Sequence, residues 1–262
     1  MHTPSSVDKD NVAVVILAAG KGSRIQEDNG GLPKVLTPLY GQPLISHLLH
    51  SIEDSTVKRP PVIVIGYKGD LVREALGSYY TYVVQSEQLG TGHAVRCTRS
   101  VLEGQVEHVV VLYGDQPHLP YDVVDRLVAQ HVATGNTLTM TTTTVENFEG
   151  WCERLRYYSH IVRNAQGELQ SVVEYKDATL EQRDIPEVNP GHYCFEAKWL
   201  WEHLDLLSNT GNSAGEYYLT DLIGMAVDQG ERIGTISIEP LHSLAVNTIE
   251  ELRLLEQVLK DV

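Results

Sequence analysis

Continuous apolar runs alternate with amphipathic stretches along the first half of this chain, and this alternation constrains the fold most. The runs carry little polar interruption, as is typical of strands buried on both faces of a sheet. They cover residues 12–17, 61–65, 79–84, 108–113 and 137–145. Between them, apolar residues recur at helical spacing after Pro43 and again over residues 123–132. Alternating strands and helices predict an α/β fold, a doubly wound and mainly parallel sheet.

The second half of the chain reads differently. Residues 157–163, 168–175 and 187–195 are strand-rich and closely spaced, which predicts an antiparallel or mixed extension that walls one side of a site. Thr248 and Glu251 have the spacing of a capping box at the start of the last helix. We expect residues 1–11 to form a flexible tail and residues 12–262 to form a single domain.

Charge and cysteine content narrow the function. With 20 Lys and Arg against 35 Asp and Glu, the formal net charge is −15, which disfavours nucleic acid and membrane surfaces as partners. The three cysteines are odd in number and include no CxxC pair, which favours a reduced, cytoplasmic chain. No apolar run approaches the roughly 20 residues of a membrane helix. Oligomeric state cannot be inferred from the sequence.

The first predicted strand ends in LAAGKGSR, residues 17–24. Small residues there let backbone N–H groups approach an anion, and Arg24 and Lys34 could focus positive charge in an acidic protein. A Gly-rich turn without a ligand is the plain alternative. The stretch lacks the third glycine of the GxGxxG dinucleotide fingerprint and the GK[ST] of a Walker A loop.

A carboxylate follows the fourth run, where VLYGDQP places Asp115 at the same predicted sheet edge. A carboxylate in that place suits Mg²⁺, which needs only one or two protein oxygens beside phosphate and water. Asn247, just before the last helix, could supply a second oxygen. Taken singly, Asp115 could equally form a turn, and Asn247 a turn or a cap.

The stretch QSEQLGTGHAV, residues 85–95, is a further strand end. The Gln85 amide can donate and accept hydrogen bonds, as recognition of a pyrimidine edge requires, and the Gly90–Gly92 backbone can lie flat against a base. A helix N-cap at Thr91 is the alternative.

Other candidates carry weaker signals. Glu174 ends a predicted strand and could accept hydrogen bonds from sugar hydroxyls, although a solvated surface charge explains it equally. Ser213 and Glu216 have capping-box spacing, so SAGEYYLTD is predicted first as a helix start and second as a pocket wall. The histidines show no HxH or HExxH spacing, and Cys97 has no evident activating partner, which argues against metalloprotease and thiol chemistry.

Taken together, the motifs resemble one family over roughly residues 12–260. LAAGKGSR, LPKVL, QSEQLGTGHAV, VLYGDQP, VEYKDA, EVNPG and EYYLTD follow the order seen in sugar-1-phosphate nucleotidylyltransferases. QLGTGHAV and EYYLTD are similar to the branch of N-acetylglucosamine-1-phosphate uridylyltransferases. The resemblance implies a Rossmann-like, GT-A-like fold and a reaction of UTP with N-acetylglucosamine 1-phosphate that yields UDP-N-acetylglucosamine and pyrophosphate, with Mg²⁺ as cofactor.

The resemblance also implies roles for individual residues. Catalysis would fall to Arg24, Lys34 and Asp115, and the metal to Asp115 and Asn247. The nucleotide would contact Leu17, Ala18, Ala19, Gly20, Gly22, Gln85, Gly90 and Thr91. The sugar would contact Tyr113, Gly114, Ser159, Glu174 and Asn189. Two alternatives stay open: the same chemistry with another hexose 1-phosphate or dTTP, and a non-catalytic nucleotide-sugar-binding regulator.

This chain departs from the family pattern on the sugar side. Ser159 and His160 replace the Gly-Arg of the usual Tyr-Gly-Arg-Ile, and Pro190 replaces the Thr of Asn-Thr-Gly. Extra residues over Glu27–Gly31 lengthen the spacing from Arg24 to Lys34, and we expect a mobile flap there that orders on UTP. The chain shows no hexapeptide repeats, so acetyl transfer is not expected.

Overall fold

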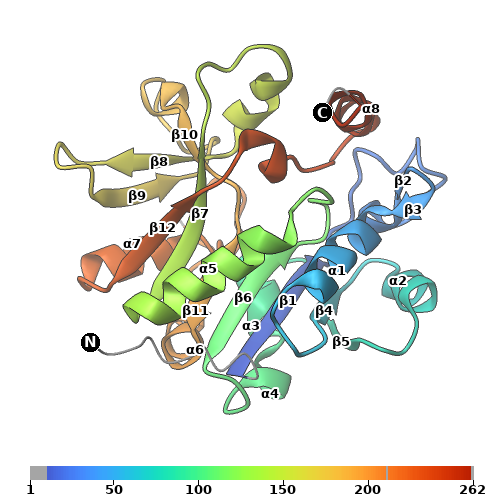
Figure 1. Cartoon of the computed structure of the whole chain (residues 1–262), viewed down its shortest axis with the longest axis horizontal. Coiled ribbons are helices and arrows are strands. Elements are labelled where there is room, and N and C mark those ends of the chain that lie inside the picture. Colours follow the sequence, from blue (N-terminus) through green and yellow to red (C-terminus); the bar gives the residue numbers. More distant parts are fainter. Residues whose placement is uncertain (1–10, 211, 261–262) are drawn as a thin grey trace.

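The computed structural model describes residues 11–210 and 212–260. Its central sheet begins with four parallel strands in the order β5-β4-β1-β6 (Figure 1). These strands are β1 (Val12–Ala18), β4 (Val62–Ile65), β5 (Thr81–Val84) and β6 (His108–Tyr113). Each was predicted from an apolar run. Since the strands are parallel, their carboxyl ends lie along one edge, where the polar motifs begin.

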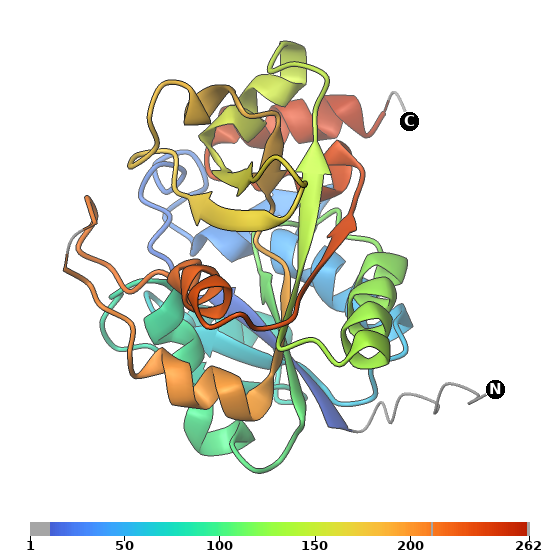
Figure 2. The ribbon, with the colours of Figure 1, turned by 90° about the vertical axis from the view of Figure 1, so that its left-hand side faces the viewer.

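The sheet continues with mainly antiparallel pairings. Strand β11 lies between β6 and β7, and β12 pairs with β7 in parallel, while β10, β8 and β9 extend the sheet outward (Figures 1 and 2). Their bounds are β7 Leu138–Thr144, β8 Ser159–Arg163, β9 Leu169–Val173, β10 Glu187–Asn189, β11 Tyr193–Glu196 and β12 Ile233–Ser237. A small hairpin joins β2 (Pro38–Leu39) and β3 (Gln42–Pro43). The predicted antiparallel extension is therefore confirmed.

The strand-rich segment at residues 187–195 contains two strands. The first, β10, pairs with β7 and β8, and the second, β11, pairs with β6 and β7. Pro190 has no N–H for a ladder, and Gly191 has φ +95°, so the chain turns between the two strands.

Helices cover both faces of the parallel strands. Helices α1 (Leu44–Asp54) and α5 (Tyr121–Thr134) lie on one face, while α3 (Thr91–Arg96), α4 (Arg99–Leu102) and α6 (Ala197–Leu204) lie on the other (Figures 1 and 2). The remaining helices are α2 (Gly69–Leu76), α7 (Asp221–Asp228) and α8 (Ile249–Val258). Shorter 3-10 turns cover Lys34–Leu36, Gly150–Tyr157, Gln182–Asp184 and Pro240–Ser243.

Alternate residues of β1 enter two separate apolar cores. Val12, Val14 and Ile16 pack in the core that contains residues of α1 and α5, whereas Ala13 and Val15 pack in the core with α3 and α6. All five are nearly or fully buried. This explains why the strand reads as a continuous apolar run, since neither of its faces meets water.

One predicted helix start is confirmed and another is wrong. At α8, the Thr248 hydroxyl accepts from the Glu251 N–H, and the Glu251 carboxylate accepts from the Thr248 N–H, which is the predicted capping box. Ser213 and Glu216 cap no helix, because α7 begins only at Asp221. Ser213 and Ala214 lie in a turn, and Tyr217 forms backbone hydrogen bonds with Leu89 and Gly92.

No helix within residues 11–210 and 212–260 is long and apolar enough to span a membrane. The predicted tail falls outside the described residues except for Asn11, and the single-domain boundary stays a prediction.

Candidate active site

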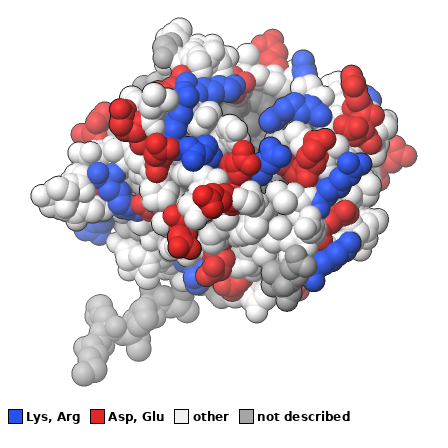
Figure 3. All heavy atoms as spheres, turned by 90° about the horizontal axis from the view of Figure 1, so that it is seen from above, with Lys and Arg blue, Asp and Glu red and all other residues white. Residues whose placement is uncertain are grey.

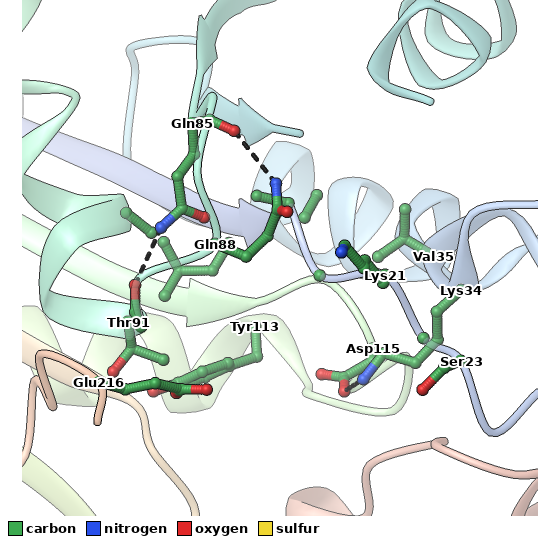
Figure 4. Close-up of a pocket in the computed structure, with 17 residues that line it drawn as sticks. Lys21, Ser23, Lys34, Val35, Gln85, Gln88, Thr91, Tyr113, Asp115 and Glu216 are labelled. Atoms are coloured by element: carbon green, nitrogen blue, oxygen red, sulfur yellow. Dashed lines mark hydrogen bonds and ion pairs between the residues drawn. The ribbon is translucent and has the colours of Figure 1, made fainter. Parts of the chain in front are cut away.

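The nucleotide residues predicted from sequence gather around a cavity of about 490 Å³ at the carboxyl ends of the parallel strands (Figure 4). The cavity is lined by all eight of them: Leu17, Ala18, Ala19, Gly20, Gly22, Gln85, Gly90 and Thr91. Lys34 and Asp115 line it as well. Lys and Arg side chains alternate with Asp and Glu over this end of the molecule, so the surface around the site carries no single sign (Figure 3).

A second cavity of about 250 Å³ adjoins the first. Four of the predicted sugar-binding residues line it: Tyr113, Ser159, Glu174 and Asn189. Both cavities share a wall made of Thr91, Tyr113, Asp115 and Glu216. Two compartments therefore meet at a carboxylate, with the antiparallel extension forming the far wall of the smaller one.

Lys34, Asp115 and Asn247 converge from three distant parts of the chain. The Lys34 ammonium forms an ion pair with Asp115 Oδ2 and donates to Asn247 Oδ1 at 2.9 Å. Lys34 opens the short 3-10 turn after Pro33, Asp115 follows β6, and Asn247 precedes α8. The side chains of Lys34 and Asp115 are only 17% and 12% exposed, so water screens this pair weakly.

The same two oxygens suit a divalent cation. Asp115 Oδ2 and Asn247 Oδ1 lie within hydrogen-bonding reach of one ammonium nitrogen, so both oxygens face one point. One carboxylate and one amide oxygen form an all-oxygen pair, which fits Mg²⁺ if phosphate and water complete its shell. In the part of the chain that the structure describes, no group of three or more His, Cys, Asp or Glu side chains could hold a metal.

The loop after β1 holds Lys34 by close packing. Gly22 has φ +61°, and a Cβ added there would lie 2.5 Å from Lys34 Cβ, so a larger residue would displace the lysine. Lys21, which lies within LAAGKGSR, lines the larger cavity as well. Arg24 is exposed and lines neither cavity, so its catalytic role stays a prediction.

The insertion over Glu27–Gly31 folds as consecutive turns. The Asn29 amide donates to Thr37 Oγ1 at 2.9 Å and accepts from the Leu32 N–H at 3.1 Å. Ile25, just before the insertion, is fully buried against residues of other elements. These contacts hold the middle of the loop and the residue before it, and its ordering by UTP stays a prediction.

The orientation of the Gln85 amide is set by its neighbours. Its Nε2 donates to the Gly90 carbonyl at 3.0 Å and to His93 Nδ1 at 3.1 Å, and its oxygen points away from Gly90 (Figure 4). Gln85 is 3% exposed and lines the larger cavity. With both N–H groups engaged, the group it offers a ligand is an acceptor.

The segments around Gly90 and Tyr217 are bonded side by side. The Tyr217 N–H donates to the Leu89 carbonyl, and the Gly92 N–H donates to the Tyr217 carbonyl, both at 2.8 Å. Thr91 Oγ1 accepts from the Leu219 N–H at 3.0 Å. Thr91 is thus the first residue of α3 rather than its N-cap, which is Gly90. Glu216 and its neighbours form the pocket wall that was the second interpretation of SAGEYYLTD.

The sugar-side polar groups are held by partners but keep capacity for a ligand. Thr220 Oγ1 donates to Glu174 Oε1 at 2.9 Å, which leaves Glu174 Oε2 available. The Asn189 amide accepts from the Gly191 N–H at 3.0 Å and donates one N–H to Tyr193 Oη at 2.6 Å, so its second N–H is unspent. Ser159 pairs with Asn189 across β8 and β10.

Three other predicted residues have clear places. Tyr113 is half-buried between the cavities, and burial, with Glu174 nearby, raises the pKa of its hydroxyl, so it stays protonated. Gly114 lines neither cavity; a Cβ there would lie 3.1 Å from Val35, so its sugar role stays a prediction. Cys97 Sγ lies 3.9 Å from His93 Nε2, but burial raises the pKa of the thiol, which therefore remains a poor nucleophile.

Sequence reasoning missed several lining residues. In the larger cavity these include Lys21, Ser23 and Gln88; in the smaller they include Gln116, Tyr158 and Tyr193. Lys21 and Gln116 lie inside motifs already singled out, so position beside a strand end was the available signal. Tyr158 and Tyr193 gave none, because aromatic residues in strand-rich sequence indicate core equally well.

Comparison with known proteins defines the class. The family model for the MobA-like NTP transferase domain matches residues 14–217, most of the chain, and the chain belongs to this family. Its relatives include the Bifunctional protein GlmU of Clostridium acetobutylicum, 40% identical over 235 residues, which are 89% of this chain and 49% of the relative. The Bifunctional protein GlmU of Clostridioides difficile is 37% identical over 251 residues, 95% of this chain and 52% of the relative. The chain spans about half the length of these curated relatives.

Solved structures confirm the fold class. A putative glucose-1-phosphate thymidylyltransferase from Bacillus anthracis, in complex with a sucrose, superimposes with a TM-score of 0.74 and 18% identity over 96% of both chains. A UDP-glucose pyrophosphorylase complexed with UDP-glucose superimposes with a TM-score of 0.75 and 16% identity, over 95% of this chain and 98% of the other. The nucleotidyltransferase fold predicted from the sequence is therefore the observed one.

Proposed function

We propose that this protein is a sugar-1-phosphate nucleotidylyltransferase that converts UTP and N-acetylglucosamine 1-phosphate to UDP-N-acetylglucosamine and pyrophosphate. One observation carries the proposal: Asp115 lines both cavities and shares Lys34 with Asn247. The larger cavity has room for a nucleoside triphosphate and the smaller for a hexose. Their junction at Asp115 is where the two phosphates would meet.

The reaction needs alignment and charge neutralisation more than a protein nucleophile. An anionic oxygen of the sugar phosphate attacks the α-phosphorus of UTP, the new P–O bond forms, and the bond to the bridging oxygen breaks to release pyrophosphate. No proton has to move. Holding the two phosphates in line lowers the entropic cost, and Lys34 neutralises charge at the α-phosphate. Magnesium, held by Asp115 and Asn247, would supply further charge neutralisation.

The Gln85 amide supports a uracil-type base. Because its N–H groups are engaged by Gly90 and His93, it presents an oxygen that can accept from N3–H of uracil or thymine. Cytosine has a bare acceptor at that ring position, so two lone pairs would face each other. UTP and dTTP are therefore favoured over CTP. Glu174 and Asn189 would hold sugar hydroxyls with their unspent acceptor and donor.

The deciding experiment measures pyrophosphate release with UTP, dTTP and CTP, each paired with N-acetylglucosamine 1-phosphate, glucose 1-phosphate or no sugar, with and without Mg²⁺. We expect release with UTP and N-acetylglucosamine 1-phosphate, in the presence of Mg²⁺ only. Release with glucose 1-phosphate but not with N-acetylglucosamine 1-phosphate would reassign the acceptor. If UTP bound but no pair released pyrophosphate, the protein would be a nucleotide-binding regulator and not an enzyme of this type.

A further inference from the structure

The Gln116 side chain lies in the wall of the smaller cavity and joins three segments of the site. It is 3% exposed and follows Asp115 at the end of β6. Its Nε2 donates to the Pro190 carbonyl at 2.8 Å and to the Ser243 carbonyl at 3.3 Å. Pro190 follows Asn189, and Ser243 lies in the segment that leads to Asn247. One amide thus connects the metal-side strand end with the sugar-side loop.

Two buried side chains set the direction of this amide. Gln116 Oε1 lies 2.9 Å from His192 Nε2, and His192 Nδ1 lies 3.0 Å from Thr141 Oγ1. Carbonyl oxygens only accept, so the Gln116 N–H groups must face Pro190 and Ser243, and Oε1 must accept from His192 Nε2–H. His192 Nδ1 then accepts from the Thr141 hydroxyl. Burial lowers the pKa of His192 to about 3, so the neutral ring that this chain of bonds requires persists near neutral pH.

The positions of Asp115 and Asn247 are held by bonds other than those of Gln116. The Val246 N–H donates to the Asp115 carbonyl at 2.9 Å, and Lys34 bridges Asp115 and Asn247. Ser243 O also accepts from the Tyr158 hydroxyl at 2.7 Å. Pro190 has no N–H, so its carbonyl is the one backbone polar group through which it can hold the loop. The Gln116 side chain donates the hydrogen bond to this carbonyl.

We propose that Gln116 is a positioning residue for the acceptor substrate. By holding the Pro190 carbonyl, it sets the place of Asn189 relative to Asp115, and therefore the place of the sugar 1-phosphate relative to the α-phosphate of UTP. This inference rests on the proposed function for its substrate. Gln116 touches no reacting atom in this role and acts through the loop at residues 189–191.

Two substitutions test the role. Gln116→Glu keeps the size and the acceptor for His192 but places an oxygen against two carbonyl oxygens. Gln116→Met removes all the polar bonds and adds no charge. In both, we expect the KM for N-acetylglucosamine 1-phosphate to rise at least about tenfold, the effect of losing a buried hydrogen bond. We expect the KM for UTP to stay within about twofold, since the nucleotide cavity keeps its own contacts.

The control is Gln130→Glu, which makes the same chemical change on the exposed side of α5. It should alter neither KM. If only charge repulsion mattered, both KM values would rise in Gln116→Glu and neither would rise in Gln116→Met. That result would overturn the inference, and so would unchanged KM values in both Gln116 variants.

A second measurement needs no catalysis. The Gly191 N–H donates to Asn189 Oδ1, so its hydrogen exchange in the free protein reports on the loop. We expect exchange at Gly191 at least about tenfold faster in both Gln116 variants and unchanged in Gln130→Glu. Exchange as slow as in the wild type would overturn the inference. If the wild-type protein released no pyrophosphate from any pair, the proposed function would fall, and this exchange measurement would still decide the role of Gln116 in the loop.

Discussion

Lys34 holds the same two oxygens that a metal would need. Its ammonium contacts Asp115 and Asn247, so a divalent ion at that point must displace it. We predict that Lys34→Met binds Mn²⁺ about tenfold more tightly than wild type without nucleotide, because no ion pair has to be broken first. Electron paramagnetic resonance of free Mn²⁺ measures this. Lys21→Met, which removes a charge from the same cavity without touching the oxygens, is the control, and equal tightening in both would contradict the prediction.

Asp115 should matter through its charge. Asp115→Asn keeps the shape and one acceptor oxygen but removes the anion that Lys34 and a metal share. We predict a fall in turnover of at least about a hundredfold at saturating substrates, comparable to loss of a preorganised electrostatic contact. Steady-state pyrophosphate release measures it. Asp205→Asn is the matched control, since Asp205 pairs with Arg99 outside both cavities. A wild-type rate in Asp115→Asn would remove this residue from the mechanism.

At the scale of elements, the segments around Gly90 and Tyr217 form one unit of the nucleotide cavity. Gly90 has φ +106° and ψ 176°, a region that only glycine populates, and an added Cβ would lie 2.6 Å from the Tyr217 carbonyl oxygen. We predict that Gly90→Ala costs at least about 2 kcal/mol of unfolding free energy and raises the KM for UTP. Urea denaturation and pyrophosphate release measure the two effects.

Gly104→Ala is the control for this prediction. Gly104 also has positive φ, +73°, but an added Cβ would meet nothing within 4 Å. Its cost should be about 1 kcal/mol from backbone strain alone, with no change in the KM for UTP. An equal cost at both positions would show that the contact with Tyr217 contributes nothing.

The turn-rich loop over Glu27–Gly31 is a second element to test. If UTP orders it, the nucleotide should slow cleavage by Glu-specific or Asp-specific protease at Glu27 and Asp28, both exposed in the structure. Mass spectrometry of the fragments with and without UTP measures the effect. Cleavage after Glu168, in the exposed turn between β8 and β9, is the internal reference. Equal protection at both sites, or none, would argue against an ordering flap.

At the scale of the whole molecule, two buried histidines link folding to pH. Burial lowers the pKa of His131 and of His192 from 6.5 to about 3. The folded protein therefore binds fewer protons than the unfolded chain between these values. Stability from these groups is complete above about pH 6.5 and is lost as pH falls toward 3, by about 1.4 kcal/mol per pH unit for each histidine.

Urea denaturation at several pH values between 7 and 4 would measure this slope. The His131→Phe variant keeps an aromatic ring against His108 and removes one titrating group. We predict that the unfolding free energy of this variant falls less steeply on acidification, by about 1.4 kcal/mol per pH unit, whatever its stability at pH 7. A slope identical to that of the wild type would show that His131 does not contribute.

The sequence by itself determined the elements whose pattern is local. Apolar runs predicted β1, β4, β5 and β6, because strands buried on both faces leave no polar alternation. The Thr248 and Glu251 spacing predicted the start of α8, since that cap is made within one turn of helix. Motif resemblance then predicted the class of protein and many of the residues that line its cavities.

Only the tertiary structure decided what those residues do to one another. Lys34 meets Asp115 and Asn247 across 81 and 213 residues of chain, a contact set by which strand lies beside which. The Ser213–Glu216 cap failed because Tyr217 bonds to the chain around Gly90, and a distant partner outweighs a local preference worth about 1 kcal/mol. Local sequence reports hydrophobic period and backbone preference, whereas convergence at a site depends on packing between distant segments.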